Sequence, residues 1–247
     1  MVRFTRHGFR EMLIGSVVFL IVGFLVGFWS PRVDLIILIC LLPLLAFLFA
    51  FFRDPERPIP TEQHLVVSPA DGTVADITHF ESDELLGAPG VRIGIFLSVF
   101  NVHVNRAPCD GRVVDIKYKE GKFINAMSHA AASSDNESNT IVLAEPKGDR
   151  RVAVVKQIVG LIARRIICTV KDGEVITRGQ RIGMIKFGSR TELYLPQWLE
   201  PEVQVKVGQK VRGGADVIAA LRKPIHTEIK ASEDPDLEPL APRETPA

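Results

Sequence analysis

Hydrophobic residues dominate the start of the chain in two uncharged runs, residues 12–29 and 35–52. Each run would form a helix of about 27 Å, which is just long enough to cross the hydrocarbon core of a bilayer. Pro31 lies in the short break between them, so the pattern predicts a helical hairpin with a tight turn. Because Pro43 interrupts the second run, a hairpin that only enters one leaflet is the alternative.

Positive charge brackets the predicted hairpin. Arg3, Arg6 and Arg10 precede the first run, and Arg53 and Arg57 follow the second. Basic residues tend to stay on the cytoplasmic side of a membrane, so both ends of the hairpin are expected there. A cleaved signal peptide is the competing interpretation, but no small-residue cleavage site separates the two runs.

From about residue 65 to residue 221 the pattern changes to short apolar stretches separated by Gly, Pro and Asp. Many of the apolar residues are β-branched, which predicts a mostly β domain with few helices. Residues 128–139 are small and polar, and we expect an exposed mobile loop there. Residues 223–247 hold five prolines and no aromatic residue, which predicts a disordered tail. The expected order is an anchor at 1–52, one globular domain at 53–222 and this tail.

A weak internal repeat occurs near the end of that domain. Residues 170–183 (VKDGEVITRGQRIG) and 205–218 (VKVGQKVRGGADVI) share V-K-x-G and a second glycine six positions later. The glycines permit tight turns, so the repeat indicates paired hairpins like those of lipoyl-like barrel-sandwich modules. Two unrelated hairpins are the alternative. The expected fold class is therefore mainly β (α+β), and the segment 187–196 is expected on an exposed, strained connection between two similar sheets.

Composition excludes several classes of function. Thirty basic residues against twenty-nine acidic ones provide no electrostatic footprint for nucleic acid. The three cysteines, Cys40, Cys109 and Cys168, have no CxxC spacing, and the six histidines have no paired spacing. We therefore expect neither a disulfide framework nor a metal site.

Three polar residues stand out because the usual hydrolase motifs GxSxG and SxxK do not fit the chain. They are Asp71 in SPADG, His103 in FNVHVN and Ser189, which follows Gly188. Together these residue types can activate a hydroxyl group. Taken singly, each has an ordinary explanation: a turn aspartate, a structural histidine and a common dipeptide.

Six sequence blocks follow the predicted hairpin in order: FRDPERPIP (52–60), SPADGTV (68–74), GIFLSVFNVHVNRAPCDG (94–111), DNESN (135–139), QIVGLIARRIIC (157–168) and GQRIGMIKFGSRTELYLP (179–196). In these blocks the chain resembles pyruvoyl-dependent phosphatidylserine decarboxylases of the short bacterial and archaeal type. The order of the blocks makes the match far more specific than any one of them.

The resemblance implies a zymogen that cuts itself between Gly188 and Ser189 into chains 1–188 and 189–247. The Ser189 hydroxyl would attack the Gly188 carbonyl, and elimination and hydrolysis would leave a pyruvoyl cofactor made from Ser189. Its ketone would form a Schiff base with phosphatidylserine, giving phosphatidylethanolamine and carbon dioxide. The resemblance also implies that the two chains stay associated, that homodimers form, and that the lyase works at the cytoplasmic side of the inner membrane.

His103 matches the family's general acid or base, and Asp71 matches the residue that orients or activates its neighbours during self-cleavage. One position departs from the longer bacterial relatives: Arg106 stands where they carry a second histidine linked to processing. That leaves open whether His103 serves both steps. The longer relatives also have LGS where this chain has FGS.

Substrate contacts are expected from Arg53, Arg57 and Arg106, which could meet the lipid phosphate or carboxylate, and from His129 on a lid formed by residues 128–139. Each arginine has the alternative of a solvated surface charge. Other classes of protein fit the sequence less well. A biotinyl-like adaptor would need a lysine in an MKM-type turn, a transport or fusion scaffold would not need the Gly188-Ser189 block, and a lapsed enzyme would not keep Asp71 and His103.

Overall fold

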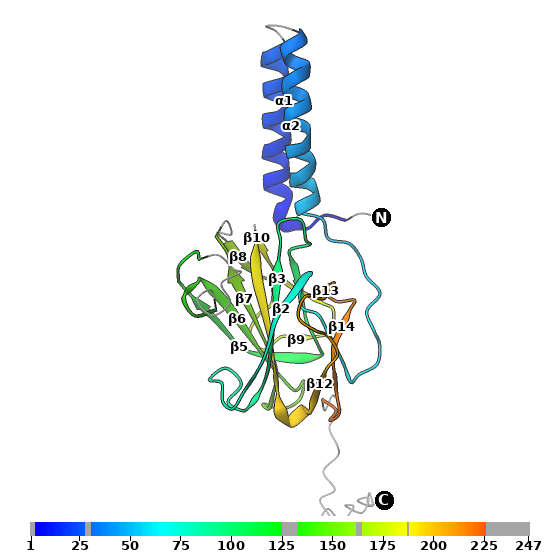
Figure 1. Ribbon diagram of the computed structural model, residues 1–247, viewed down its shortest axis with the longest axis vertical. Coiled ribbons are helices and arrows are strands. Elements are labelled where there is room, and N and C mark those ends of the chain that lie inside the picture. Colours follow the sequence, from blue (N-terminus) through cyan, green and yellow to red (C-terminus); the bar gives the residue numbers. More distant parts are fainter. Residues whose placement is uncertain (1–2, 28–30, 125–132, 162–164, 187, 226–247) are drawn as a thin grey trace, which may run out of the picture.

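The structure, a computed structural model, describes residues 3–27, 31–124, 133–161, 165–186 and 188–225. A helical hairpin stands on a β domain, as Figure 1 shows. The helices are η1 (Arg6–Gly8), α1 (Phe9–Gly27), α2 (Pro31–Phe51) and η2 (Gln197–Leu199). The strands are β1 (Leu65–Val67), β2 (Gly72–Phe80), β3 (Gly90–Leu97), β4 (Val104–Arg106), β5 (Gly111–Lys119), β6 (Ser138–Ala144), β7 (Arg151–Val159), β8 (Arg165–Cys168), β9 (Val175–Ile176), β10 (Arg181–Lys186), β11 (Ser189–Pro196), β12 (Pro201–Val203), β13 (Lys210–Val211) and β14 (Val217–Leu221).

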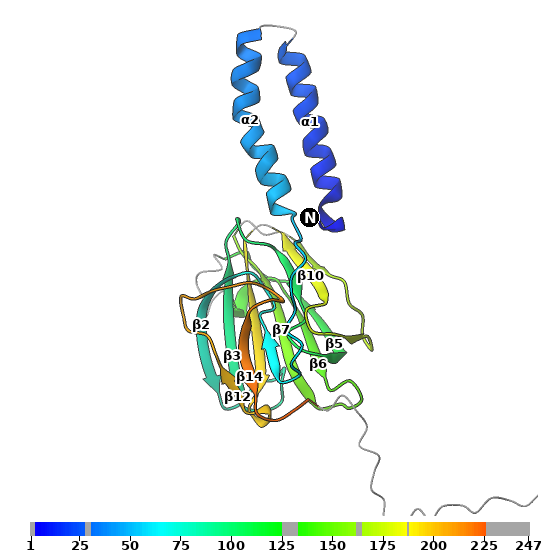
Figure 2. The ribbon, with the colours of Figure 1, turned by 90° about the vertical axis from the view of Figure 1, so that its right-hand side faces the viewer.

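Helices α1 and α2 lie side by side in both views (Figures 1 and 2). They begin three and four residues earlier than the hydrophobic runs predicted. For α2 the reason is that Pro31 is the first residue of the helix and does not lie in a turn. Pro43 stays inside α2. Among the described residues, the helical segment Arg6–Val26 is long and apolar enough to cross a membrane, and Ile39–Phe51 is a shorter apolar helix.

The β domain consists of antiparallel sheets. The largest has eight strands in the order β13-β2-β3-β11-β7-β6-β5-β9, and two three-stranded sheets have the orders β1-β14-β12 and β4-β10-β8. One continuous apolar core fills the domain, built mainly from Val, Ile and Leu side chains of these strands. The predicted mainly β class is confirmed. Strand β11 lies at the centre, paired with β3 on one side and β7 on the other.

The predicted repeat is confirmed in three dimensions. Strand β9 pairs with the start of β5, and β13, which is 35 positions later, pairs in the same way with the start of β2. Equivalent glycines before them, Gly173 and Gly208, have positive φ angles of 79° and 88°. Strands β2 and β5 also each carry a bulge at the equivalent place. The domain therefore contains two similar halves.

The expected position of the segment between the repeats was wrong. It does not form an exposed connection, since its residues from Ser189 to Pro196 form strand β11 and are all buried. Successive side chains of this strand point to opposite faces of the sheet, and both faces are buried. Polar residues of the segment therefore pack in the interior as part of a central strand.

The expected mobile loop at 128–139 lies partly outside the described residues. In its described part, Asn136 is fully buried, and its side-chain amide donates to the carbonyl oxygens of Ile124 and Val159 at 2.8 Å each. This part of the loop is therefore anchored to β7. The expected tail at 223–247 lies outside the described residues from residue 226 onwards.

Candidate active site

Ser189 begins strand β11, where it pairs with Leu97 of β3 and Val159 of β7. The residue is fully buried, and its Oγ atom has no hydrogen-bond partner among the described residues. Leaving a buried hydroxyl unpaired costs about 1–3 kcal/mol, so such a group in a native structure calls for an explanation. A role in chemistry provides one.

Gly188 places the backbone in an unusual conformation just before this hydroxyl. Its φ angle is +68°, a left-handed conformation that residues with a side chain rarely adopt. The space around it is open, because an added Cβ would meet only Val99 Cγ1, at 3.6 Å. The Gly188 N–H donates a hydrogen bond to His103 Nε2 at 3.2 Å. The structure therefore brings together Gly188, Ser189 and His103, as expected from the sequence.

The ring of His103 is held on three sides. Its Nδ1 lies 2.9 Å from the Asn101 carbonyl oxygen, so Nδ1 carries the proton and Nε2 keeps a lone pair that accepts from Gly188. The Phe51 ring at the end of α2 lies against the imidazole, with 4.3 Å between ring centroids. Burial and, to a smaller extent, the charge of Arg53 lower the pKa of His103 to about 4, although the hydrogen bond with the Asn101 carbonyl acts in the opposite direction. The imidazole is therefore a neutral base at neutral pH.

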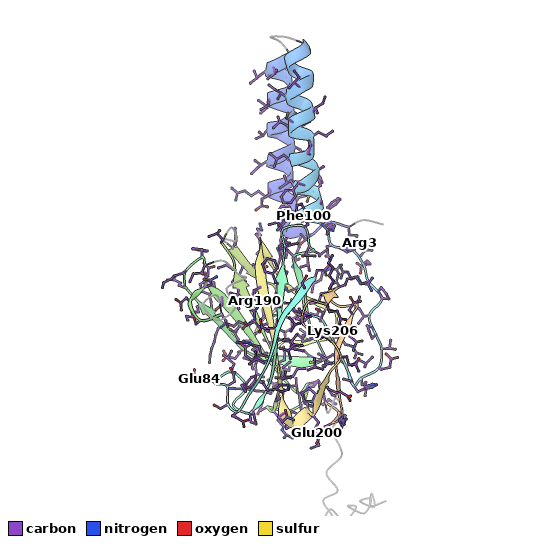
Figure 3. The ribbon with its side chains drawn as sticks, in the orientation of Figure 1. Arg3, Glu84, Phe100, Arg190, Glu200 and Lys206 are labelled. Carbon is purple, nitrogen blue, oxygen red and sulfur yellow. The ribbon has the colours of Figure 1, made fainter. Side chains whose placement is uncertain are left out.

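A tight turn formed by residues 98–101 positions the Asn101 carbonyl. The Asn101 side chain accepts hydrogen bonds from the backbone N–H and the hydroxyl of Ser98, at 2.9 and 2.7 Å. Phe100 at the tip of this turn is 72% exposed and contacts Phe47 of α2, with 5.9 Å between ring centroids. Figure 3 shows Phe100 at the base of the hairpin. Sequence reasoning did not identify Asn101 or Phe51 as supports of His103, although Asn101 stands inside the FNVHVN block.

Asp71 forms a buried ion pair with Arg57. Both carboxylate oxygens accept from the guanidinium at 2.7 Å, and Oδ1 also accepts from the Gly213 N–H at 2.8 Å. The other half of the domain repeats only the last bond, since Asp110 accepts from the Arg178 N–H at 2.8 Å. The bond from the backbone is thus a shared structural feature, whereas the pairing with Arg57 distinguishes Asp71 from its counterpart.

Asp71 has no direct hydrogen bond to His103 or Ser189 among the described residues. It lines a cavity of about 590 Å³ together with Ser98 and Asn101, beside the turn that holds His103. Of the three expected residues, His103 therefore contacts the Gly188-Ser189 segment directly. Asp71 instead lines the cavity beside the turn that holds His103.

Besides Arg57, three more side chains were expected to contact substrate, and their surroundings differ. Arg53 lies beside the site and donates to the Ala50 and Phe100 carbonyl oxygens at 2.6 Å each. Arg106 is buried and donates to Asp54 at 3.0 Å, as well as to two backbone carbonyl oxygens. The hydrogen bonds that Arg106 makes to described residues thus join β4 to the segment after α2. His129 lies outside the described residues.

A buried ionic cluster lies on the other face of β11, and sequence reasoning missed it. Arg190 is fully buried and pairs with Asp76 of β2 and, at 2.8 Å, with Glu192. To reach β2 the guanidinium crosses β3 at Gly94, where an added Cβ would overlap it. The position of Arg190 inside the β domain is visible in Figure 3. The signal in the sequence was Gly94, a glycine inside a strand.

A second link joins the strand after His103 to the strand that begins with Ser189. The Asn105 amide of β4 donates to the Thr191 hydroxyl at 3.1 Å, and Gln157 of β7 donates to Asn105 at 2.9 Å. All three residues are fully buried. Within the described part of the chain, no group of three or more His, Cys, Asp or Glu residues is arranged to hold a metal ion.

Comparison with known proteins gives one consistent result. The family model for phosphatidylserine decarboxylase matches residues 44–219. Relatives described as phosphatidylserine decarboxylase proenzymes include one from Carboxydothermus hydrogenoformans, 46% identical over 88% of this chain and 96% of the relative. One from Rhodopirellula baltica is 42% identical over 87% of each chain, and one from Granulibacter bethesdensis is 46% identical over 86% of this chain and 83% of its own.

Proposed function

Because the chain belongs to the phosphatidylserine decarboxylase family, we propose that it converts phosphatidylserine to phosphatidylethanolamine and carbon dioxide with a pyruvoyl group made from Ser189. The observation that carries the proposal is the buried Ser189 hydroxyl, which has no hydrogen-bond partner among the described residues and directly follows a left-handed glycine. The name proenzyme, given to the relatives, implies that they are processed.

The residues present fit a pyruvoyl group at position 189. The site is fully buried, so the group would be protected from bulk water. The neighbouring strands β3 and β7 hold residue 189 by backbone pairing on both sides, and this pairing does not depend on the peptide bond to Gly188. Strands β11, β13 and β14 of the small chain pair with strands of the large chain, which supports lasting association of the two chains after the cut.

Self-cleavage is assigned to groups that lie around the scissile bond. The Ser189 Oγ attacks the Gly188 carbonyl, and the absence of a side chain on Gly188 leaves the carbonyl accessible. His103 Nε2 carries the lone pair of a base and holds Gly188 through its N–H. Asp71, which pairs with Arg57, lines the same cavity as the turn that holds His103, and its role is to fix the electrostatics of that wall.

In decarboxylation, the pyruvoyl group supplies a carbonyl that withdraws electrons from the substrate's α-carbon and so lets the carboxylate depart. His103 provides the site for proton exchange, and the apolar rings around it exclude water. Arg53 at the base of α2 is the cation best placed for the lipid phosphate or carboxylate, with Arg106 and His129 as further candidates.

The position of the site beneath the hairpin supports a membrane-bound substrate. Phe51 at the end of α2 contacts His103 directly, so a lipid headgroup at the membrane surface is close to the site. The arginines at both ends of the hairpin support insertion from the cytoplasmic side of the inner membrane. Homodimer formation is part of the proposal and rests on the family alone.

Intact mass spectrometry of the purified chain tests the proposal. The wild type should give a fragment of 59 residues (247 − 188) that is lighter than its serine-terminated form by the mass of one ammonia, and it should convert phosphatidylserine in mixed micelles. Ser189→Ala should stay whole and inactive, whereas Ser82→Ala, at an exposed serine, should behave as wild type. A folded wild-type chain that remains uncut would overturn the proposal.

A further inference from the structure

Self-cleavage creates a charge inside a buried site. In the elimination step a base removes the Ser189 α-proton, a carbon–carbon double bond forms, and the electrons of the Cβ–O ester bond leave with Gly188 as a carboxylate. Water then replaces the nitrogen of the dehydroalanine end, and ammonia departs. The large chain therefore ends in a Gly188 carboxylate, where the uncut chain had a neutral peptide group.

This new carboxylate belongs to a residue that already contacts His103. The Gly188 nitrogen lies 3.2 Å from Nε2, and the carboxylate carbon is two bonds from that nitrogen. The imidazole is fully buried and its other nitrogen is occupied by the Asn101 carbonyl. Nε2 is therefore the ring atom that faces the new chain end.

We propose that the Gly188 carboxylate produced by cleavage becomes the ion-pair partner of His103, so that the imidazole is neutral in the uncut chain and carries a proton in the mature enzyme. The inference rests on the proposed function and deepens it. It assigns His103 to both steps: as a base it serves processing, and as an acid it holds at Nε2 the proton that the product's α-carbon requires. This also explains how one histidine can suffice where Arg106 replaces a second one.

The other charged groups around the imidazole do not provide this pairing. Arg53 after α2 is itself a cation and disfavours the protonated ring. Lys186 on β10 is paired with Glu11 of α1 at 2.6 Å, and Arg190 is engaged on the opposite face of β11. A carboxylate within about 4–6 Å typically raises the pKa of a histidine by 1–3 units, more strongly where water is excluded.

Histidine NMR on two forms of the full chain tests the inference. The processed wild type and the uncut Ser189→Ala chain are labelled with ¹⁵N-histidine in the same detergent. The His103 signal of the uncut chain is assigned from its loss in Ser189→Ala/His103→Gln, and that of the processed protein is the signal left after the other histidines are matched between the two spectra. We expect the titration midpoint of His103 to rise from about 4 by about 3 pH units or more in the processed protein, so that the ring is protonated up to neutral pH. The signals of the exposed His64 and His79 should be the same in both proteins and serve as internal references.

Borohydride reduction separates the carboxylate from the cofactor. Reduction turns the ketone of the pyruvoyl group into an alcohol but leaves the Gly188 carboxylate in place, so the raised midpoint should persist. Equal midpoints in the processed and uncut proteins would overturn the inference, and so would a raised midpoint that disappears on reduction. Absence of cleavage in the mass spectrum of the wild type would instead refute the proposed function.

Discussion

Substitution of Gly188 by alanine isolates the contribution of its backbone conformation to self-cleavage. An added Cβ has room, because the nearest atom, Val99 Cγ1, would be 3.6 Å away. The cost therefore falls on the backbone: a φ angle of +68° is disfavoured by about 1–2 kcal/mol for a residue with a side chain. This strain is relieved only if the backbone leaves the left-handed region, which breaks the hydrogen bond from the Gly188 N–H to His103.

We expect Gly188→Ala to fold, to lose about 1 kcal/mol of stability and to cleave itself about tenfold more slowly, since 1.4 kcal/mol corresponds to a factor of ten in rate. The assay follows the appearance of the small chain after synthesis by gel electrophoresis. The matched control is Gly208→Ala, where φ is +88° and nothing lies within 4 Å of an added Cβ. This control carries a similar strain far from the site.

The outcome distinguishes two explanations. Slow cleavage in Gly188→Ala with normal cleavage in Gly208→Ala would show that the conformation at the scissile bond matters. Equal slowing of both would mean that general destabilisation is responsible. Cleavage of Gly188→Ala at the wild-type rate, with stability reduced as in the control, would refute the reasoning.

Three further predictions concern the surroundings of the site. The pKa of His103 is about 4 in the folded uncut chain, against about 6.5 for an ordinary histidine. Between these two pH values the unfolded chain binds one proton more than the folded chain. The free energy of unfolding of Ser189→Ala should therefore fall by up to about 3 kcal/mol as the pH falls through this window. Chemical denaturation at pH 7 and pH 4.5 measures this loss, and adding His103→Gln should reduce it; an unchanged pH dependence would contradict the burial argument. Gly94→Ala should prevent Arg190 from crossing β3 and destabilise the domain by more than about 3 kcal/mol, measured as a fall in melting temperature, while a stable variant would show that the guanidinium has another path. Thr191→Val should cost about 1 kcal/mol because the Asn105 amide loses the nearer of its two acceptors and keeps the Pro69 carbonyl oxygen at 3.5 Å, and Thr191→Ser should restore most of the loss; equal stability of the two variants would exclude the hydrogen bond as the cause.

Much of the fold was predictable from the sequence because it depends on local patterns. Two uncharged runs are sufficient to indicate a helical hairpin, and short β-branched stretches between turn residues are sufficient to indicate a β domain. The 35-residue repeat was visible because tight turns require glycines at fixed places, here Gly173 and Gly208. The start of α2 was displaced because Pro31 was assigned to a turn, although proline is equally suited to the first position of a helix.

The tertiary structure alone decided how the candidate residues work. Gly188 and His103 are 85 positions apart, and only the packing of β10 and β11 brings them to hydrogen-bond distance. Burial between Phe51 and Asn101 sets the protonation of His103, and the ion pair with Arg57 distinguishes Asp71 from its counterpart in the repeat. A sequence pattern reports the periodicity of an element and the types of its side chains. It does not report which distant side chains share a buried environment, and that environment determines whether a histidine is a base or an acid.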